Sequence, residues 1–148
     1  MIVVRGCAFA PDRYYHVDYN VWILQRAPGM IELGATAFGA ALAIEFFAFT
    51  PKASGSAIDA GRAVGLLELS KTVVSVRSPV AGTLAEINAA VVARPSLISA
   101  DPYGAGWLVR LATSANLAEN AQLVSGEALR QPFEAAMALE NFEGPGTA

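Results

Sequence analysis

Lysine is scarce in this sequence, and one of its lysines lies where another enzyme can reach it. The ten basic residues are eight arginines and two lysines, Lys52 and Lys71. Lys71 lies in a short polar segment between the apolar runs 63–69 and 73–77, a pattern that predicts a β-hairpin. A tight turn between two strands projects its central side chain away from the fold. The pattern therefore predicts an accessible amine that can be modified by amide formation, with an ordinary solvated lysine as the alternative.

The residue types that usually perform catalysis form no recognisable constellation. His16 is the only histidine and has no nucleophile motif near it, so a partly buried strand histidine is the simpler interpretation. Cys7 is the only cysteine, which excludes an internal disulfide and favours an inert, buried thiol. No cluster of histidine, cysteine and carboxylate residues predicts a metal site, and the sequence has no glycine-rich phosphate loop. The residues alone predict no catalytic group and no bound metal.

Length and composition favour one domain, or one domain plus a tail. The chain has 148 residues, of which 54% are apolar and 16% are charged. Its longest uncharged stretch, residues 33–44, is shorter than the roughly 20 residues that a membrane-spanning helix needs. The first residues lack the pattern of a signal peptide, and the net charge of −3 argues against nucleic-acid binding. We therefore predict a cytoplasmic protein that binds neither membranes nor nucleic acid.

Many short strands followed by one helix are predicted along the chain. Alternating or β-branched residues predict strands, and alanine-rich or helically periodic segments predict helices, with Thr36 and Ser125 as caps. Strands are predicted at 14–25, 30–33, 44–49, 63–69, 73–77, 83–87 and 107–111, and helical segments at 36–42, 88–93 and 126–141. This order is typical of an antiparallel β sandwich or barrel. We predict a lead at 1–13, a domain at 14–124, and a C-terminal helix and tail at 125–148 packed on the same domain.

Several motifs around and after Lys71 resemble those of one known family. The segment Glu-Leu-Ser-Lys-Thr at 68–72, followed by Pro-Val-Ala-Gly at 79–82, resembles the lipoyl-lysine hairpin of glycine cleavage system H proteins. In that family a glutamate precedes the modified lysine by three residues, as Glu68 precedes Lys71. Glu-Ile-Asn at 86–88, Pro-Ser-Leu-Ile at 95–98 and Asp-Pro-Tyr-Gly-Ala-Gly-Trp at 101–107 also match. The last motif is the most specific, and the resemblance runs from about Tyr15 to Leu139.

The resemblance implies a fold, a cofactor and a role. The implied fold is mainly β, a barrel-sandwich hybrid of the lipoyl and biotinyl carrier type, with short helices and a C-terminal helix. Lipoic acid in amide linkage to Lys71 would form a swinging arm on a carrier protein that is not itself an enzyme. Glu68, Ser70 and Thr72 would be recognised by the lipoate-attaching enzyme, and dihydrolipoamide dehydrogenase would be a further partner. We predict turn geometry as the role of Pro102, Gly104 and Gly106, and a core position for Trp107.

The first predicted strand departs from the family pattern. Asn20 stands where the family usually has a histidine, Tyr19 where it has a glutamate, and the lead at residues 5–11 is longer. These features are more similar to the H-like lipoate-binding proteins of heterodisulfide-reductase-like sulfur oxidation. The resemblance therefore predicts a monomer whose arm shuttles sulfur intermediates to a heterodisulfide-reductase-like complex. Two alternatives stay open: a glycine cleavage H protein that carries the aminomethyl group between glycine decarboxylase and aminomethyltransferase, and an unlipoylated H-like binding module.

Overall fold

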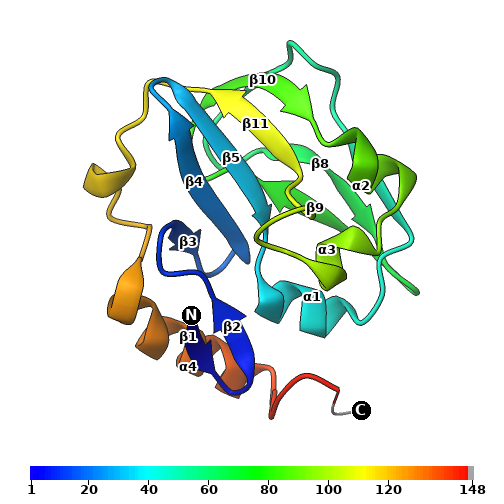
Figure 1. Cartoon of the computed structure of the whole chain (residues 1–148), viewed down its shortest axis with the longest axis vertical. Coiled ribbons are helices and arrows are strands. Elements are labelled where there is room, and N and C mark those ends of the chain that lie inside the picture. Colours follow the sequence, from blue (N-terminus) through cyan, green and yellow to red (C-terminus); the bar gives the residue numbers. More distant parts are fainter. Residues whose placement is uncertain (147–148) are drawn as a thin grey trace.

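Antiparallel β-strands in three sheets form the framework of the fold (Figure 1). The structure is a computed structural model that describes residues 1–146. Thr147 and Ala148, the end of the predicted C-terminal tail, lie outside the described residues. The largest sheet has the strand order β3-β4-β5-β11-β10-β7. Its strands are β3 (Tyr14–His16), β4 (Val21–Ala27), β5 (Met30–Ala35), β7 (Ala57–Ile58), β10 (Gly82–Ile87) and β11 (Val109–Ala112).

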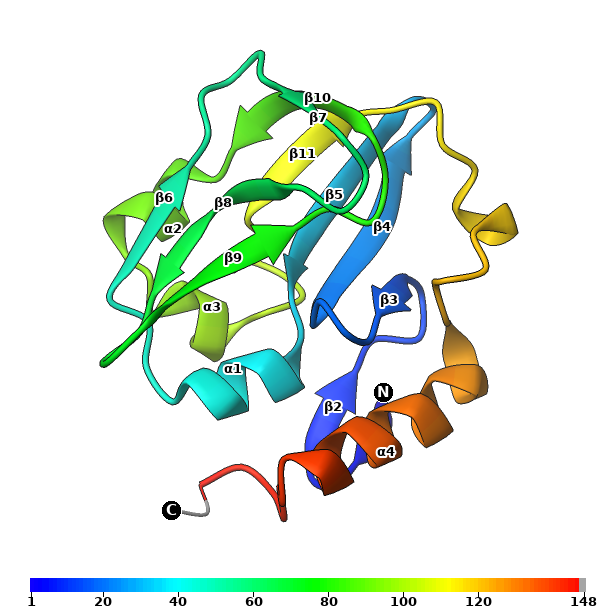
Figure 2. The ribbon, with the colours of Figure 1, turned by 180° about the vertical axis from the view of Figure 1, so that it is seen from behind.

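A smaller sheet with the order β6-β8-β9 covers one face of the large sheet (Figure 2). Its strands are β6 (Ala48–Pro51), β8 (Ala63–Glu68) and β9 (Val73–Arg77). Leu67 of β8 is buried, whereas Leu66 and Glu68 on either side of it are exposed, as the period of two in a half-buried strand requires. Val64 is also buried, because the register of β8 against β9 shifts between Ala63 and Gly65. The main core between the two sheets includes Val21, Ile23, Ile31, Leu33, Phe49, Val76, Leu84 and Leu111.

Three short helices close one end of this body. They are α1 (Ala37–Ala43), α2 (Ala89–Ala93) and α3 (Leu97–Ala100). The predicted N-cap is confirmed, because the hydroxyl of Thr36 accepts a hydrogen bond from the backbone N–H of Gly39 at 3.0 Å. Asn88 caps α2 in the same way by accepting from the N–H of Ala90. Within residues 1–146, no helix has the length and apolar character needed to cross a membrane.

The two ends of the chain build a second core together. The N-terminal hairpin of β1 (Ile2–Val4) and β2 (Cys7–Phe9) packs against α4 (Arg130–Leu139). Arg5 donates to the carboxylate of Glu134 at 2.7 Å and to the carbonyl of Phe142 at 2.7 Å. The apolar members of this core include Cys7, Phe9, Tyr15, Trp22, Phe38, Leu129, Phe133 and Met137. The predicted domain boundaries stay a prediction.

The structure corrects the predicted strand at residues 14–25, which is in fact a hairpin. His16 pairs with Val21, and residues 17–20 form the turn between β3 and β4. Asn20 has a positive φ of 56°, a conformation that asparagine tolerates better than most residues. The alternation of apolar side chains continues across the turn by coincidence of spacing, so the sequence pattern did not reveal the reversal.

Three further boundaries differ from the prediction. The strand expected at 44–49 begins only at Ala48, because the chain makes a tight turn at Ile44 after α1. The C-terminal helix begins as a 3-10 turn, η2 (Gly126–Leu129), before α4, and Ser125 makes no capping hydrogen bond. The lead is an ordered hairpin, in which Arg5 and Gly6 both have positive φ. A second 3-10 turn, η1 (Leu117–Glu119), lies between β11 and η2.

Candidate functional site

The β8–β9 hairpin ends in a two-residue turn that contains Lys71 (Figure 2). Glu68 pairs with Val73, and the backbone N–H of Leu69 donates to the carbonyl of Thr72 at 2.8 Å. Only Ser70 and Lys71 remain between these paired residues, and both are exposed. The predicted hairpin is therefore confirmed, and Lys71 lies at the end that projects from the small sheet.

The four residues predicted for lipoylation lie together at this tip. Glu68 is on the outer face of β8, and Ser70, Lys71 and Thr72 follow it around the turn. All four are exposed. Within residues 1–146, none of their side chains makes a hydrogen bond or an ion pair. These side chains are therefore available to a partner without breaking any contact inside the protein.

A cavity of about 330 Å³ lies beside the hairpin and was not predicted from the sequence. Its apolar lining residues, here called the apolar wall, come from both hairpin strands, from α1 and from the segment after it. Its polar lining residues, here called the polar wall, come from the β3–β4 turn and from β9. The apolar wall includes Leu42, Phe46, Leu67, Leu69, Val74 and Val76, and the polar wall includes Asp18, Tyr19, Asn20, Ser75 and Arg77.

His16 and Tyr19 hold the β3–β4 turn in place at the polar wall. The two rings stack with their centroids 3.7 Å apart, and Nδ1 of His16 accepts a hydrogen bond from the backbone N–H of Tyr19 at 3.1 Å. Burial lowers the pKa of His16, because the charged imidazolium would lose its hydration. The guanidinium of Arg77 lies 5.9 Å from the Tyr19 ring on the cavity side. His16 is therefore a structural residue, as its sequence context predicted.

Asn20 joins the same turn to the start of α1. Its Oδ1 accepts a hydrogen bond from the hydroxyl of Thr36 at 2.6 Å, and its backbone carbonyl accepts from the N–H of Thr36 at 3.1 Å. The residue that replaces the family's usual histidine thus lies at the cavity wall and also positions the helix cap. The departures from the family pattern at Tyr19 and Asn20 were the sequence signals that pointed to this wall.

The Asp-Pro-Tyr-Gly-Ala-Gly-Trp motif at 101–107 is a structural junction. The hydroxyl of Tyr103 donates to the carbonyl of Ala8 at 2.6 Å and accepts from the N–H of Ala37 at 3.0 Å, so it links β2 to α1. The buried Arg13 donates to the carbonyl of Tyr103 at 3.0 Å. Predicted turn geometry is confirmed at Gly106, where a Cβ would lie 2.5 Å from the carbonyl oxygen of Leu97.

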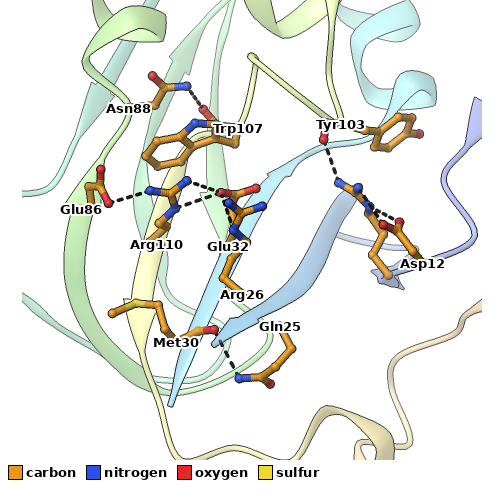
Figure 3. A network of polar contacts seen from close by, with 11 residues as sticks. Asp12, Gln25, Arg26, Met30, Glu32, Glu86, Asn88, Tyr103, Trp107 and Arg110 are labelled. Atoms are coloured by element: carbon orange, nitrogen blue, oxygen red, sulfur yellow. Dashed lines mark hydrogen bonds and ion pairs between the residues drawn. The ribbon is translucent and has the colours of Figure 1, made fainter. Parts of the chain in front are cut away.

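Trp107 was predicted to be a core residue, and it packs against the second core as a partly buried side chain at its edge. Its ring is only half-buried and lies under Arg110, whose guanidinium is 4.1 Å from the ring centroid (Figure 3). Arg110 also pairs with the buried carboxylate of Glu32 at 2.8 Å and with Glu86 at 2.8 Å. This network lies on the strands of the large sheet and contains none of the residues of the Lys71 tip.

The fold and the site together define a class of protein. The three-stranded sheet presents one unpaired lysine at the tip of a β-hairpin, and the sequence contains no recognisable catalytic constellation. This arrangement is typical of proteins that carry a covalently attached group. The family model described as "Glycine cleavage H-protein" matches residues 13–136, and the chain belongs to this family.

Named relatives and a solved structure agree with this assignment. The chain is 33% identical to the probable glycine cleavage system H protein 2 of Saccharolobus solfataricus, over 96% of this chain and 97% of that protein. It is 36% identical to the glycine cleavage system H protein 5 of Aquifex aeolicus, over 75% of this chain and 77% of that protein. The crystal structure of a glycine cleavage system H protein from Mycobacterium marinum matches with a TM-score of 0.70 and 27% identity, covering 90% of this chain and 98% of that one.

These comparisons confirm three predictions. The fold class is mainly β with short helices and a C-terminal helix, and the neighbouring structure has the barrel-sandwich fold. Members of the family carry covalently attached lipoic acid and act as carriers rather than catalysts. Their partners are glycine decarboxylase, aminomethyltransferase, lipoate ligase and dihydrolipoamide dehydrogenase. The predicted association with sulfur oxidation receives no support from these comparisons.

Proposed function

We propose that Lys71 carries a lipoyl group in amide linkage and that the chain acts as a swinging-arm carrier. The position of Lys71 carries this proposal: it lies in a two-residue turn, exposed and unpaired, three residues after Glu68. A flexible arm on a rigid hairpin would convert transfer between separate active sites into a local search at high effective concentration. The carrier itself then needs no acid, base or metal.

The surroundings of Lys71 are compatible with an attached lipoyl group. Nζ of Lys71 would lose a proton and attack the carboxyl carbon of a lipoyl group activated as an acyl phosphate. The C–N bond forms, the phosphate leaves, and the nitrogen loses a second proton. When bound, a lipoyl group supplies a dithiolane ring whose disulfide opens on reduction and takes up a substrate on sulfur. Leu69 and Val74 belong to the apolar wall of the cavity beside the hairpin, and this wall suits a hydrocarbon arm.

We propose that the lipoate-attaching enzyme recognises the side chains of Glu68, Ser70 and Thr72. Their side chains are exposed and have no partner within residues 1–146, so binding the enzyme would break no internal hydrogen bond. The carboxylate of Glu68 and the two hydroxyls offer acceptors and donors on both sides of Lys71. Replacing Glu68 by Gln should slow attachment without changing where the group is attached.

The two lysines provide a matched test of attachment. Wild-type protein, Lys71→Ala and Lys52→Ala would each be purified from the native host and measured by intact mass spectrometry. We expect wild type and Lys52→Ala to carry the mass of one lipoyl group, and Lys71→Ala to carry none. Lys52 is exposed in the turn region after β6, so it controls for surface exposure. Wild-type protein without the added mass would contradict the proposal and favour the unlipoylated binding module.

For the cargo of the arm, we propose sulfur intermediates delivered to a heterodisulfide-reductase-like complex. Arg77 supports this choice, because the residue lines the cavity and its guanidinium forms no ion pair within residues 1–146, so it would favour an oxidised, anionic sulfur group. Asp18 supports the alternative, because its carboxylate lines the same cavity and would favour the ammonium of an aminomethyl group. The partners of each route and a cytoplasmic, monomeric state belong to the proposal.

Two activities and two variants distinguish the two cargoes. Lipoylated protein would be assayed for glycine–bicarbonate exchange with glycine decarboxylase and for turnover with the heterodisulfide-reductase-like complex. The sulfur proposal predicts turnover only with the latter, reduced by Arg77→Gln and little changed by Asp18→Asn. Exchange activity that falls in Asp18→Asn and survives in Arg77→Gln would instead establish the aminomethyl route.

A further inference from the structure

The chain makes a strained turn at Ile44, directly after α1. Ile44 has φ 66° and ψ −54°, and the N–H of Glu45 donates to the carbonyl of Ala43 at 2.7 Å. These values define a γ-turn of the rare, strained form, and a β-branched residue with positive φ is a genuine outlier. The Ile44 side chain gains no burial in return, because it is 84% exposed. Backbone strain of this kind tends to persist where a function requires it.

The strained turn lies next to the Lys71 hairpin. The N–H of Phe47 donates to the carbonyl of Glu68 at 2.8 Å, so the segment after the turn is bonded directly to β8. Leu42, just before the turn, lines the same cavity as Val74 of β9. Figure 2 shows the chain leaving α1 and passing to β6 on the side of the hairpin tip. The turn and the tip therefore belong to one surface.

This surface exposes apolar side chains within an acidic border. We define the Ile44 patch as Leu42, Ile44, Phe47 and Val73, which are 40%, 84%, 53% and 55% exposed. Glu45 and Glu68 border the patch, and neither carboxylate forms an ion pair within residues 1–146. A partner that presents an apolar pocket bordered by lysine or arginine would complement it. A second copy of the chain would not, because it would bring the same carboxylates together.

We propose that the Ile44 patch is the docking surface for the enzyme that attaches lipoate to Lys71; this inference rests on the proposed function of Lys71. Specific interfaces bury about 800 Å² on each partner and use about 20–30 residues a side. The four residues 69–72 at the tip are too few for such an interface. An enzyme that binds Lys71 in its active site also covers the surface around Lys71. Ile44 has the most exposed apolar side chain of the Ile44 patch.

Replacing Ile44 by glycine separates docking from folding. Glycine adopts the positive φ without strain, so Ile44→Gly should keep or raise the melting temperature while it removes the anchor. Initial rates of lipoylation would be measured with the lipoate-attaching enzyme of the same organism, ATP and increasing concentrations of the unmodified chain. We expect KM for the chain to rise about tenfold with kcat within twofold of wild type, and Glu45→Lys to raise KM as well.

A matched control is available at an exposed apolar side chain outside the Ile44 patch. Leu139 at the end of α4 is 85% exposed, and Leu139→Ala should leave both KM and kcat unchanged. An unchanged KM in Ile44→Gly, with wild type normally lipoylated at Lys71, would overturn the docking surface alone. Wild type that gains no lipoyl mass would overturn the proposed function and this inference with it. Light scattering provides one more test. If wild type is a dimer and Ile44→Gly is a monomer, the proposed docking surface is overturned, because the patch would then bind a second copy of the chain.

Discussion

The polar groups of the Lys71 tip and those of the turn at residues 101–107 differ in whether they have hydrogen-bond partners inside the protein. At the tip, the side chains of Glu68 and Lys71 are exposed and make no hydrogen bond or ion pair within residues 1–146. In the turn, the Tyr103 hydroxyl both donates and accepts, and its carbonyl accepts from Arg13. The longer and more specific sequence motif is therefore the structural one, whereas the signal for the proposed function is one lysine in a short hairpin. In this chain the length of a motif indicates how many residues a turn needs for its structure, and it does not indicate which residue is modified.

The first prediction concerns the loss of the Phe133 ring from the second core. Phe133 is fully buried and lies 4.4 Å from Phe9 between ring centroids. Phe133→Ala should lower the free energy of unfolding by about 3–5 kcal/mol, because it removes buried apolar surface and leaves a cavity. Urea denaturation measures this value. A loss below about 1 kcal/mol would mean that the core of β2 and α4 contributes little to stability.

The second prediction addresses the junction itself. Tyr103→Phe should lower the free energy of unfolding by about 1–3 kcal/mol, because the carbonyl of Ala8 and the N–H of Ala37 would both lose their partner. Tyr14→Phe is the control, since its hydroxyl makes no hydrogen bond within the described residues. Equal effects of the two substitutions in thermal unfolding would contradict the role assigned to the Tyr103 hydroxyl.

The third prediction concerns pH and the cavity wall. The pKa of His16 is lowered by burial in the folded state, so the unfolded state takes up a proton more readily. Its contribution to stability should be fully present above about pH 6.5, the usual value for histidine, and should decrease as the pH falls below it. Protonation would also remove the acceptor for the Tyr19 N–H.

Urea midpoints measured between pH 5 and pH 8 test this dependence, with Asp18 as the nearest charged side chain. Asp18→Asn should steepen the loss, because the carboxylate partly offsets the lowering of the His16 pKa. His16→Gln should flatten the dependence over this range. A profile that is unchanged in His16→Gln would assign the pH effect to other groups.

The smallest effects on stability are expected at the site itself. Lys71→Ala and Glu68→Gln should each change the free energy of unfolding by less than about 0.5 kcal/mol, because both side chains are exposed and without partners. The same substitutions should abolish and slow lipoylation, respectively. If Lys71→Ala were to destabilise the protein by 2 kcal/mol, the contrast between the tip and the junction would no longer hold.

The sequence predicted the hairpin well because its signals are local. Two alternating runs around Ser70 and Lys71 determine both strands and the turn, and Thr36 as a cap is equally local. The β3–β4 turn was missed because the apolar alternation continues through it to Val21. The β1–β2 hairpin was missed because strands of three residues carry almost no pattern, although Arg5-Gly6 marked the turn.

The cavity and the Ile44 patch could not be predicted, because they depend on segments that meet only in the folded chain. Asp18, Leu42 and Val74 come from three separate parts of the sequence and line one cavity. An isoleucine gives no signal for a positive φ, since this conformation is unfavourable for β-branched residues. The hydrogen bond of Phe47 to Glu68 and the cavity shared by Leu42 and Val74 place the patch beside the tip.

Lys71 is the only basic residue in the segments 42–47 and 68–73, where Glu45 and Glu68 supply the negative charges. Conversion of its ammonium to an amide would make this end of the molecule uniformly acidic and the whole chain one unit more negative than −3. The modified and unmodified forms should therefore separate in native gel electrophoresis. Partner enzymes would meet two electrostatically different surfaces, so that the attaching enzyme can release its product and later partners can select it.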